Sequence, residues 1–242
     1  MIKPEVFESS ESLHEAAAEY LIQCYETAVS DHDSFHIALS GGSTPKKLYQ
    51  LLSKAPYTDK IDWQKVHCYF GDERFVAHDD EQSNYRMVKE SMLDSIDFPA
   101  KNIHAVNTSL DCAPKSAEDY EKVMADNLPK ENDQGVFDLV LLGLGTDGHT
   151  ASLFPDTEIL TVTESNCASV YVEKMESWRI SITFPVINRA KHILLLSENV
   201  TKADIVKSLC EWDKPEPNYP IQRVQPQHEM RWYIDRPAAM FI

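Results

Sequence analysis

The sequence predicts an α/β fold in which a mostly parallel sheet is flanked by helices. Segments with helical periodicity alternate along most of the chain with short apolar runs of strand length. Residues 139–142 are apolar at every position, as expected for a parallel strand buried on both faces. Six of the seven glycines lie in segments that directly follow such runs. These features are typical of parallel strands connected by helices.

The first helix is expected at residues 10–30, where apolar side chains such as Leu13 and Leu21 recur at helical spacing. Ser12 and Glu15 resemble a capping box, in which each side chain satisfies a backbone N–H of the first turn. Together these features predict an amphipathic helix near the start of the chain.

The remaining elements follow in alternation. A strand at 35–39 precedes a helix that is expected to begin at Pro45, where the missing N–H of proline costs nothing, and to end near residue 54. Further strands are expected at 66–70, 103–106, 137–142, 169–172, 180–184, 192–196 and 231–234, and further helices at 83–93, 115–128 and 201–212. Residues 213–226 contain four prolines and are expected to form a loop. No repeat or low-complexity linker interrupts the pattern, so residues 1–242 are expected to form a single domain.

Charge and cysteine usage exclude several classes of protein. The 23 basic and 39 acidic residues give a net charge of −16, and no basic run of five residues occurs, so nucleic acid and membrane surfaces are not expected partners. The polar N-terminus is unlike a signal or transit peptide, and the apolar runs are too short to span a bilayer. The five cysteines are scattered and contain no CxxC pair, which argues against disulfides or a zinc site. The sequence therefore predicts a reduced, cytoplasmic protein.

Glycine is rare in this chain, with seven in 242 residues against roughly 7% in an average protein. Six of the seven fall at 41–42, at 71 and at 143–148, each segment directly after a predicted buried strand. Ligands of open α/β sheets bind beyond the carboxyl ends of the strands, and glycine lets backbone approach a ligand closely. The three segments are therefore expected to converge on one site.

The first segment, with Gly41, Gly42, Ser43 and Thr44, lies between a strand and a helix. Its backbone N–H groups, hydroxyls and helix N-terminus suit an anion such as phosphate. The alternative is a tight turn in which Thr44 merely caps the helix.

The second segment places Asp72, Glu73 and Arg74 after a buried strand. These residues either form a solvated ion-pair cluster or belong to a site, where Arg74 holds an anion or orients a carboxylate.

The third segment contains GxGxxG at 143–148, which invites a dinucleotide-binding interpretation. We reject it because Pro155 leaves little room for a crossover helix and Asp147 puts negative charge where a pyrophosphate would lie. In addition, no βαβ partner carries an acid at the end of the next strand. His149 is instead a candidate general base, since imidazole titrates near neutral pH, and Asp147 is placed to orient it.

Several motifs resemble the 6-phosphogluconolactonase family. They are SGGSTP at 40–45, FGDER at 70–74, LLGLGTDGHTASLFP at 141–155, RISITFPVINRAKHILLL at 179–196 and VQP at 224–226. Lys202 falls where that family has a lysine at the start of a helix. The chain departs from the family at Asn199 and Val200, where relatives often carry glycine.

The resemblance implies a three-layer α/β/α fold of the type shared with glucosamine-6-phosphate deaminase and ribose-5-phosphate isomerase. It also implies hydrolysis of 6-phospho-D-glucono-1,5-lactone, the second step of the oxidative pentose phosphate pathway, with no cofactor and no metal. The expected partner is the small-molecule lactone, and the chain is expected to be a monomer or a weak homo-oligomer. The rivals are a deaminase or isomerase on the same scaffold and a non-enzymatic sugar-phosphate sensor.

Within this interpretation His149 activates water. Asp72 and Asp147 are the candidates to orient the His149 ring or the sugar hydroxyls. Backbone N–H groups near Gly42 or Gly145 are the candidates for an oxyanion hole. The residues expected to hold the phosphate are Ser43, Thr44, Arg74, Arg179 and Lys202.

Overall fold

The computed structural model describes residues 3–214 and 216–242. The first two residues of the polar N-terminal segment and Pro215 of the expected loop lie outside this description. The helices are α1 (Ser10–His32), α2 (Ser43–Leu52), α3 (Asn84–Ser91), α4 (Ala113–Asn127), α5 (Phe184–Arg189) and α6 (Ala203–Cys210). The strands are β1 (Glu5–Phe7), β2 (Phe35–Leu39), β3 (Val66–Phe70), β4 (Asp72–Arg74), β5 (Ile103–His104), β6 (Lys130–Glu131), β7 (Gln134–Gly135), β8 (Leu139–Gly143), β9 (Cys167–Val172), β10 (Ser177–Ile182), β11 (His192–Ser197) and β12 (Glu229–Asp235).

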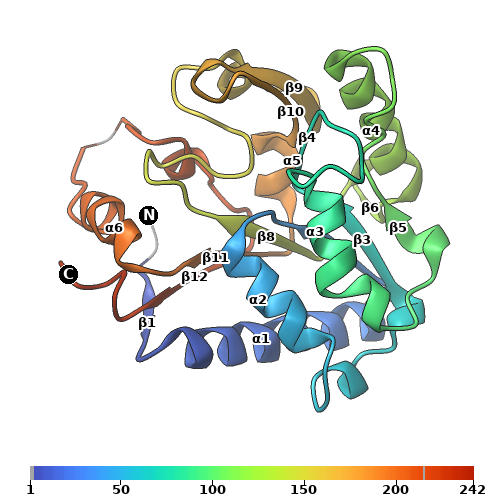
Figure 1. The fold of residues 1–242 in the computed structure, drawn as a ribbon, viewed down its shortest axis with the longest axis horizontal. Coiled ribbons are helices and arrows are strands. Elements are labelled where there is room, and N and C mark those ends of the chain that lie inside the picture. Colours follow the sequence, from blue (N-terminus) through green and yellow to red (C-terminus); the bar gives the residue numbers. More distant parts are fainter. Residues whose placement is uncertain (1–2, 215) are drawn as a thin grey trace.

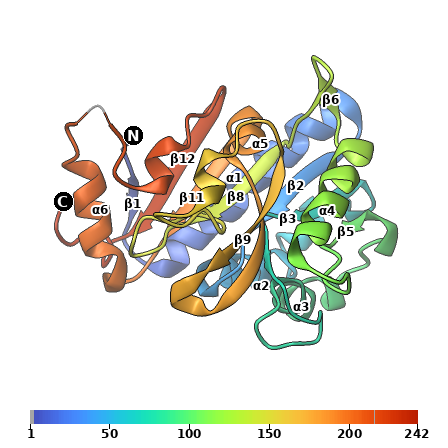
Figure 2. The ribbon, with the colours of Figure 1, turned by 90° about the horizontal axis from the view of Figure 1, so that it is seen from above.

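The central sheet has seven strands in the order β1-β12-β11-β8-β2-β3-β5. Every neighbouring pair in it is parallel. Helices flank this sheet, with α1 and α2 packed together and α5 lying across the sheet from α1 (Figures 1 and 2). The predicted α/β class with a mostly parallel sheet is therefore confirmed. None of the described helices is long and apolar enough to cross a membrane.

Two of the predicted strands lie outside the central sheet. Strands β9 and β10 pair antiparallel with each other, and β10 pairs with the short strand β4, so the three form a separate sheet. In Figure 1 this small sheet lies above the carboxyl ends of the central strands. The strand expected at 180–184 ends at Ile182, and Phe184 begins a helix that the sequence analysis missed. Pro185 in the first turn of that helix is a start signal.

Helix starts also differ from the prediction in detail. The capping box of α1 joins Ser9 and Ser12, whose side chains each accept the other's backbone N–H, so the expected pair of Ser12 with Glu15 is wrong. Helix α2 begins at Ser43, which makes Pro45 its third residue, because Gly42 already turns the chain at φ 102°.

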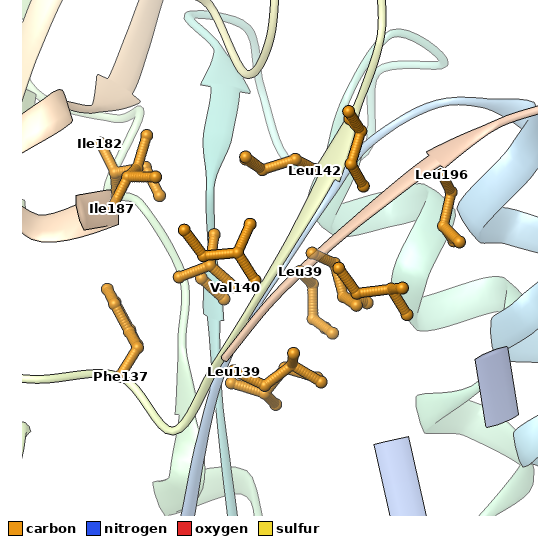
Figure 3. Packing of buried hydrophobic residues seen from close by; sticks show 14 of the residues in the cluster. Leu39, Phe137, Leu139, Val140, Leu142, Ile182, Ile187 and Leu196 are labelled. Atoms are coloured by element: carbon orange, nitrogen blue, oxygen red, sulfur yellow. The ribbon is translucent and has the colours of Figure 1, made fainter. Parts of the chain in front are cut away.

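The core lies on both faces of the central sheet. Figure 3 shows Val140 on the same side of β8 as Ile182 and Ile187, whereas Leu139 points to the other side. All four side chains are fully buried, which explains why β8 is apolar on both faces. The packing fixes the strands, so the loops at their carboxyl ends are held on a rigid frame.

Candidate active site

The three glycine segments line one cavity of about 240 Å³ at the carboxyl edge of the sheet. The loop after β2 contributes residues 40–45, the segment after β3 contributes Asp72 and Arg74, and the loop after β8 contributes residues 143–145 and His149. The predicted convergence is confirmed. Met175, Arg179 and Lys202 complete the wall from the β9–β10 hairpin and the turn after β11.

The turn before α2 presents backbone N–H groups to this cavity. Gly42 is the N-cap residue and makes no side-chain cap, so the alternative in which Thr44 caps the helix is wrong. No described residue accepts a hydrogen bond from the N–H of Gly42, Ser43 or Thr44. Free N–H groups at a helix N-terminus carry partial positive charge and attract anions.

Arg74 and Arg179 face each other on neighbouring strands. They are directly paired in the β4–β10 ladder, and both line the cavity. The Nε atom of each is buried and has no hydrogen-bond partner in the described structure. Burial and the neighbouring Arg74 guanidinium lower the pKa of Arg179. Opposed like charges with unused donors are a costly arrangement that an anion bound between them would offset.

Lys202 adds a third cation to the cavity wall, and burial lowers the pKa of its ammonium. The turn before it contains Asn199 and Val200. Asn199 adopts φ 86° and ψ 147°, a region that side chains rarely occupy. Its N–H donates to the Asp235 carboxylate at 3.0 Å, and its side chain accepts from the Thr201 N–H. These contacts hold an asparagine in a glycine-like conformation, and Lys202 still reaches the cavity.

His149 lies against Asp147, with Nδ1 2.5 Å from the Asp147 Oδ1 atom. The ring stacks on Phe154 with centroids 4.1 Å apart. Gly145 is required beside it, since a Cβ there would overlap the His149 ring. Because Asp147 holds Nδ1, and no hydrogen bond to Nε2 is described, the Nε2 atom is left to exchange a proton.

Burial and hydrogen bonding have opposing effects on the pKa values of His149 and Asp147. Burial lowers the pKa of His149, and the hydrogen bond that His149 donates to Asp147 offsets part of that effect. Burial alone raises the pKa of Asp147, but hydrogen bonds from Lys174 and His149 more than offset it and lower the pKa to about 2. Asp147 is therefore a carboxylate at neutral pH, and His149 is neutral, as a base requires.

Asp72 does not contact His149 in this structure. Its carboxylate accepts hydrogen bonds from Ser152 Oγ at 2.6 Å and from Asn84 Nδ2 at 3.2 Å. Glu73 points to the other face of β4, where it accepts the N–H groups of Asn84 and Tyr85 at the start of α3. Neither acid pairs with Arg74 in a described salt bridge, so the solvated ion-pair alternative is wrong.

Among the N–H groups near Gly145 that are candidates for an oxyanion hole, that of Gly145 itself is already engaged. Its N–H donates to the His149 carbonyl at 2.8 Å and closes the loop on itself. The N–H groups of Gly42, Ser43 and Thr44, by contrast, have no partner in the described structure.

Sequence reasoning missed several residues around the site. Lys174 contacts Asp147 from the tip of the β9–β10 hairpin and lies 4.7 Å from the Phe154 ring centroid. Met175 of the same tip lines the cavity. Nothing in the local sequence marked them, because the hairpin reaches the site only through its pairing with β4.

Comparisons with known proteins identify the family to which the chain belongs. Residues 8–233 match the family model described as glucosamine-6-phosphate isomerases/6-phosphogluconolactonase. A Synechocystis protein named 6-phosphogluconolactonase is 37% identical over 213 residues, covering 88% of this chain and 86% of that protein. The structure of 6-phosphogluconolactonase from Trypanosoma cruzi is 29% identical with a TM-score of 0.86, covering 99% of this chain and 97% of that one.

A monomeric glucosamine-6-phosphate deaminase of the NagB superfamily has the same fold, with a TM-score of 0.83 at 20% identity and full coverage of both chains. The match to the family model spans nearly the whole chain and includes every loop of the cavity. The chain belongs to the family of glucosamine-6-phosphate isomerases and 6-phosphogluconolactonases.

Proposed function

We propose that this chain hydrolyses 6-phospho-D-glucono-1,5-lactone to 6-phospho-D-gluconate in the pentose phosphate pathway, as a single-domain enzyme. One observation carries the proposal. Arg74, Arg179 and Lys202 line the same small cavity as His149 with its Asp147 partner. A cavity with a cationic side and a neutral base suits a substrate that has a phosphate at one end and an electrophilic carbonyl at the other.

The phosphate end binds Arg74, Arg179 and Lys202 together with the free N–H groups of Ser43 and Thr44 in the first turn of α2. Guanidinium groups donate to phosphate in bidentate fashion, and each such charge-assisted hydrogen bond is stronger than a neutral one. The local cations also offset the repulsion between an anionic substrate and a chain of net charge −16.

At the lactone end, the Nε2 atom of His149 removes a proton from water as the water oxygen bonds to the lactone carbonyl carbon. Asp147 stabilises the imidazolium that forms and fixes the ring's tautomer. The N–H of Gly42, which is not used for the phosphate, stabilises the oxyanion, and one such donor is typically worth about 3 kcal/mol. The bond from the carbonyl carbon to the ring oxygen then breaks, and the imidazolium returns its proton to that oxygen. The product is a carboxylic acid that ionises in water.

The named relatives favour a lactonase over a deaminase. The deaminase likeness is 20% identical and shows the fold alone, whereas the 37% identical relative carries the lactonase name. The GDER and DGHTASLFP segments, both at the cavity, are the motifs by which the sequence resembles the lactonases.

The test is acid release from 6-phosphogluconolactone that glucose-6-phosphate dehydrogenase generates in situ, with spontaneous hydrolysis subtracted. We expect hydrolysis well above background for the wild type and a loss of about 10²-fold or more in His149→Ala. Activity that survives this substitution would move the base elsewhere, first to Asp72. A folded wild type that does not accelerate hydrolysis would contradict the proposal, and release of ammonia from glucosamine 6-phosphate would then favour the deaminase.

A further inference from the structure

His14 is a buried histidine of α1 whose two ring nitrogens both face backbone carbonyls. Nε2 lies 2.9 Å from the Thr44 carbonyl, and Nδ1 lies 2.6 Å from the Ser10 carbonyl. A carbonyl oxygen only accepts hydrogen bonds, and a neutral imidazole has a single N–H. The ring therefore donates to at least one of these carbonyls, and the Ser10 hydroxyl, 3.4 Å from Nδ1, is a further polar group beside it.

Glu198 places a buried carboxylate beside His14. Its Oε2 atom lies 4.0 Å from His14 Nδ1 and accepts from Ser10 Oγ at 2.6 Å, while its Oε1 atom lies 2.9 Å from Lys47 Nζ. Glu198 is 6% exposed, so water screens these contacts little. Burial alone raises the pKa of Glu198, but Ser10 and Lys47 more than offset it, so the group is a carboxylate.

The network joins the two segments to which we assign phosphate binding. His14 holds the Thr44 carbonyl in the first turn of α2, whose free N–H groups face the cavity. Glu198 directly follows β11 and begins the turn that leads through Asn199 to Lys202. Neither His14 nor Glu198 lines the cavity, so both act through the residues they hold.

We propose that His14 and Glu198 are positioning residues that fix the N-terminal turn of α2 and the Lys202 turn relative to one another for binding of the substrate phosphate. This inference rests on the proposed function. Loss of His14 leaves the Thr44 carbonyl without its hydrogen bond, and loss of the Glu198 charge breaks its contact with Lys47. Either change displaces the turns and weakens phosphate binding without touching the base.

The experiment compares His14→Gln and Glu198→Gln with the wild type. We expect the KM for the lactone to rise about threefold to tenfold in each, with kcat within about twofold of wild type. Binding of 6-phosphogluconate, measured by calorimetry, should weaken by a similar factor.

His32→Gln is the matched control. His32 lies on the same helix and contacts the buried Asp138 carboxylate at 2.9 Å, but at the opposite end of the sheet. The His32→Gln substitution should lower the stability of the fold and leave the KM for the lactone unchanged. Lys47→Met is a second variant for the case in which the buried variants fail to fold. Its side chain is half-exposed, so we expect the variant to fold and its KM to rise as in the buried variants.

The outcomes separate this inference from the proposed function. An active wild type with folded variants whose KM equals that of wild type would show that the network is only structural and overturn the inference. A wild type that does not hydrolyse the lactone contradicts the proposed function. In that case a titration with inorganic phosphate tests the inference, because weaker phosphate binding by the variants supports it and equal binding overturns it.

Discussion

Arg74 and Arg179 are directly opposed residues on adjacent antiparallel strands, and both open onto the same cavity. Like charges at opposed positions destabilise a sheet, so the fold gains nothing from this pair by itself. Their buried Nε atoms have no partner within the described residues. We infer that this pair lowers the stability of the free protein and serves to bind an anion.

Substitution of Arg179 tests whether the arginine pair serves anion binding at the expense of stability. Arg179→Met should raise KM for the lactone by about 10- to 100-fold, because one charge-assisted contact is lost, while kcat falls much less. The unliganded variant should be at least as stable as wild type, since the repulsion from Arg74 is removed. Steady-state kinetics measures the change in KM, and thermal unfolding with and without inorganic phosphate measures the change in stability. A variant that is less stable and binds normally would mean that Arg179 is structural.

Substitution of Asp147 tests the orientation of the base and predicts a pH effect. Asp147→Asn should lower kcat by about 10²- to 10⁴-fold, because the amide no longer fixes the His149 tautomer or stabilises its cation. The Asp147 hydrogen bond raises the pKa of His149 against the lowering by burial. Its removal should therefore move the acid limb of the kcat–pH profile to lower pH. Asp72→Asn is the control: it breaks no hydrogen bond to His149 and removes only a smaller Coulombic effect on its pKa, so the acid limb should move less. An unchanged acid limb in Asp147→Asn would count against the pairing.

The lack of a side chain at Gly145 leads to a prediction about steric overlap with the His149 ring. A Cβ at this position overlaps the His149 ring, whereas a Cβ on Gly143 of the same loop meets its nearest atom, Ser40 Oγ, at 3.6 Å. Gly145→Ala should therefore reduce kcat by about 10²-fold or more, because the base is displaced from water and from Asp147. Gly143→Ala should retain most activity. Equal kcat values for the two variants in steady-state assays would contradict this account.

A stacked group of histidines at the opposite end of the sheet predicts acid sensitivity of the fold. His36 and His67 stack with centroids 4.4 Å apart, and His67 Nδ1 lies 3.1 Å from His104 Nε2. Burial, with repulsion from His67, lowers the pKa of His36 to about 3 and that of His104 to about 4. The unfolded chain binds these protons near pH 6.5, so it holds more protons than the folded chain between about pH 6.5 and pH 4.

The free energy of unfolding should therefore fall as pH drops below 6.5, by at most about 1.4 kcal/mol per pH unit for each proton. Urea unfolding at pH 7.5, 6 and 5 measures the slope. His104→Gln should flatten the slope by one proton, and a slope equal to that of wild type would show that His104 does not contribute.

Local patterns in the sequence determined the class of fold and the place of the site. The strands at 35–39 and 66–70 are found at the predicted residues because their side chains are buried on both sides of a parallel sheet. The glycine segments converge because carboxyl ends of parallel strands share one edge, and His149 with Asp147 could be singled out because both lie in one of those segments.

The tertiary structure decided which groups meet. The tip residues Lys174 and Met175 reach the cavity through long-range pairing of β10 with β4, which no local period encodes. The pairing of Asp147 rather than Asp72 with His149 depends on which carboxylate faces the ring, and Ser152 and Asn84 engage Asp72 instead. Likewise, the Gly145 N–H is consumed within its own loop, a detail of backbone geometry. Hydrogen-bond partners are set by orientations of a few degrees and tenths of an ångström, and these follow only from the packed chain.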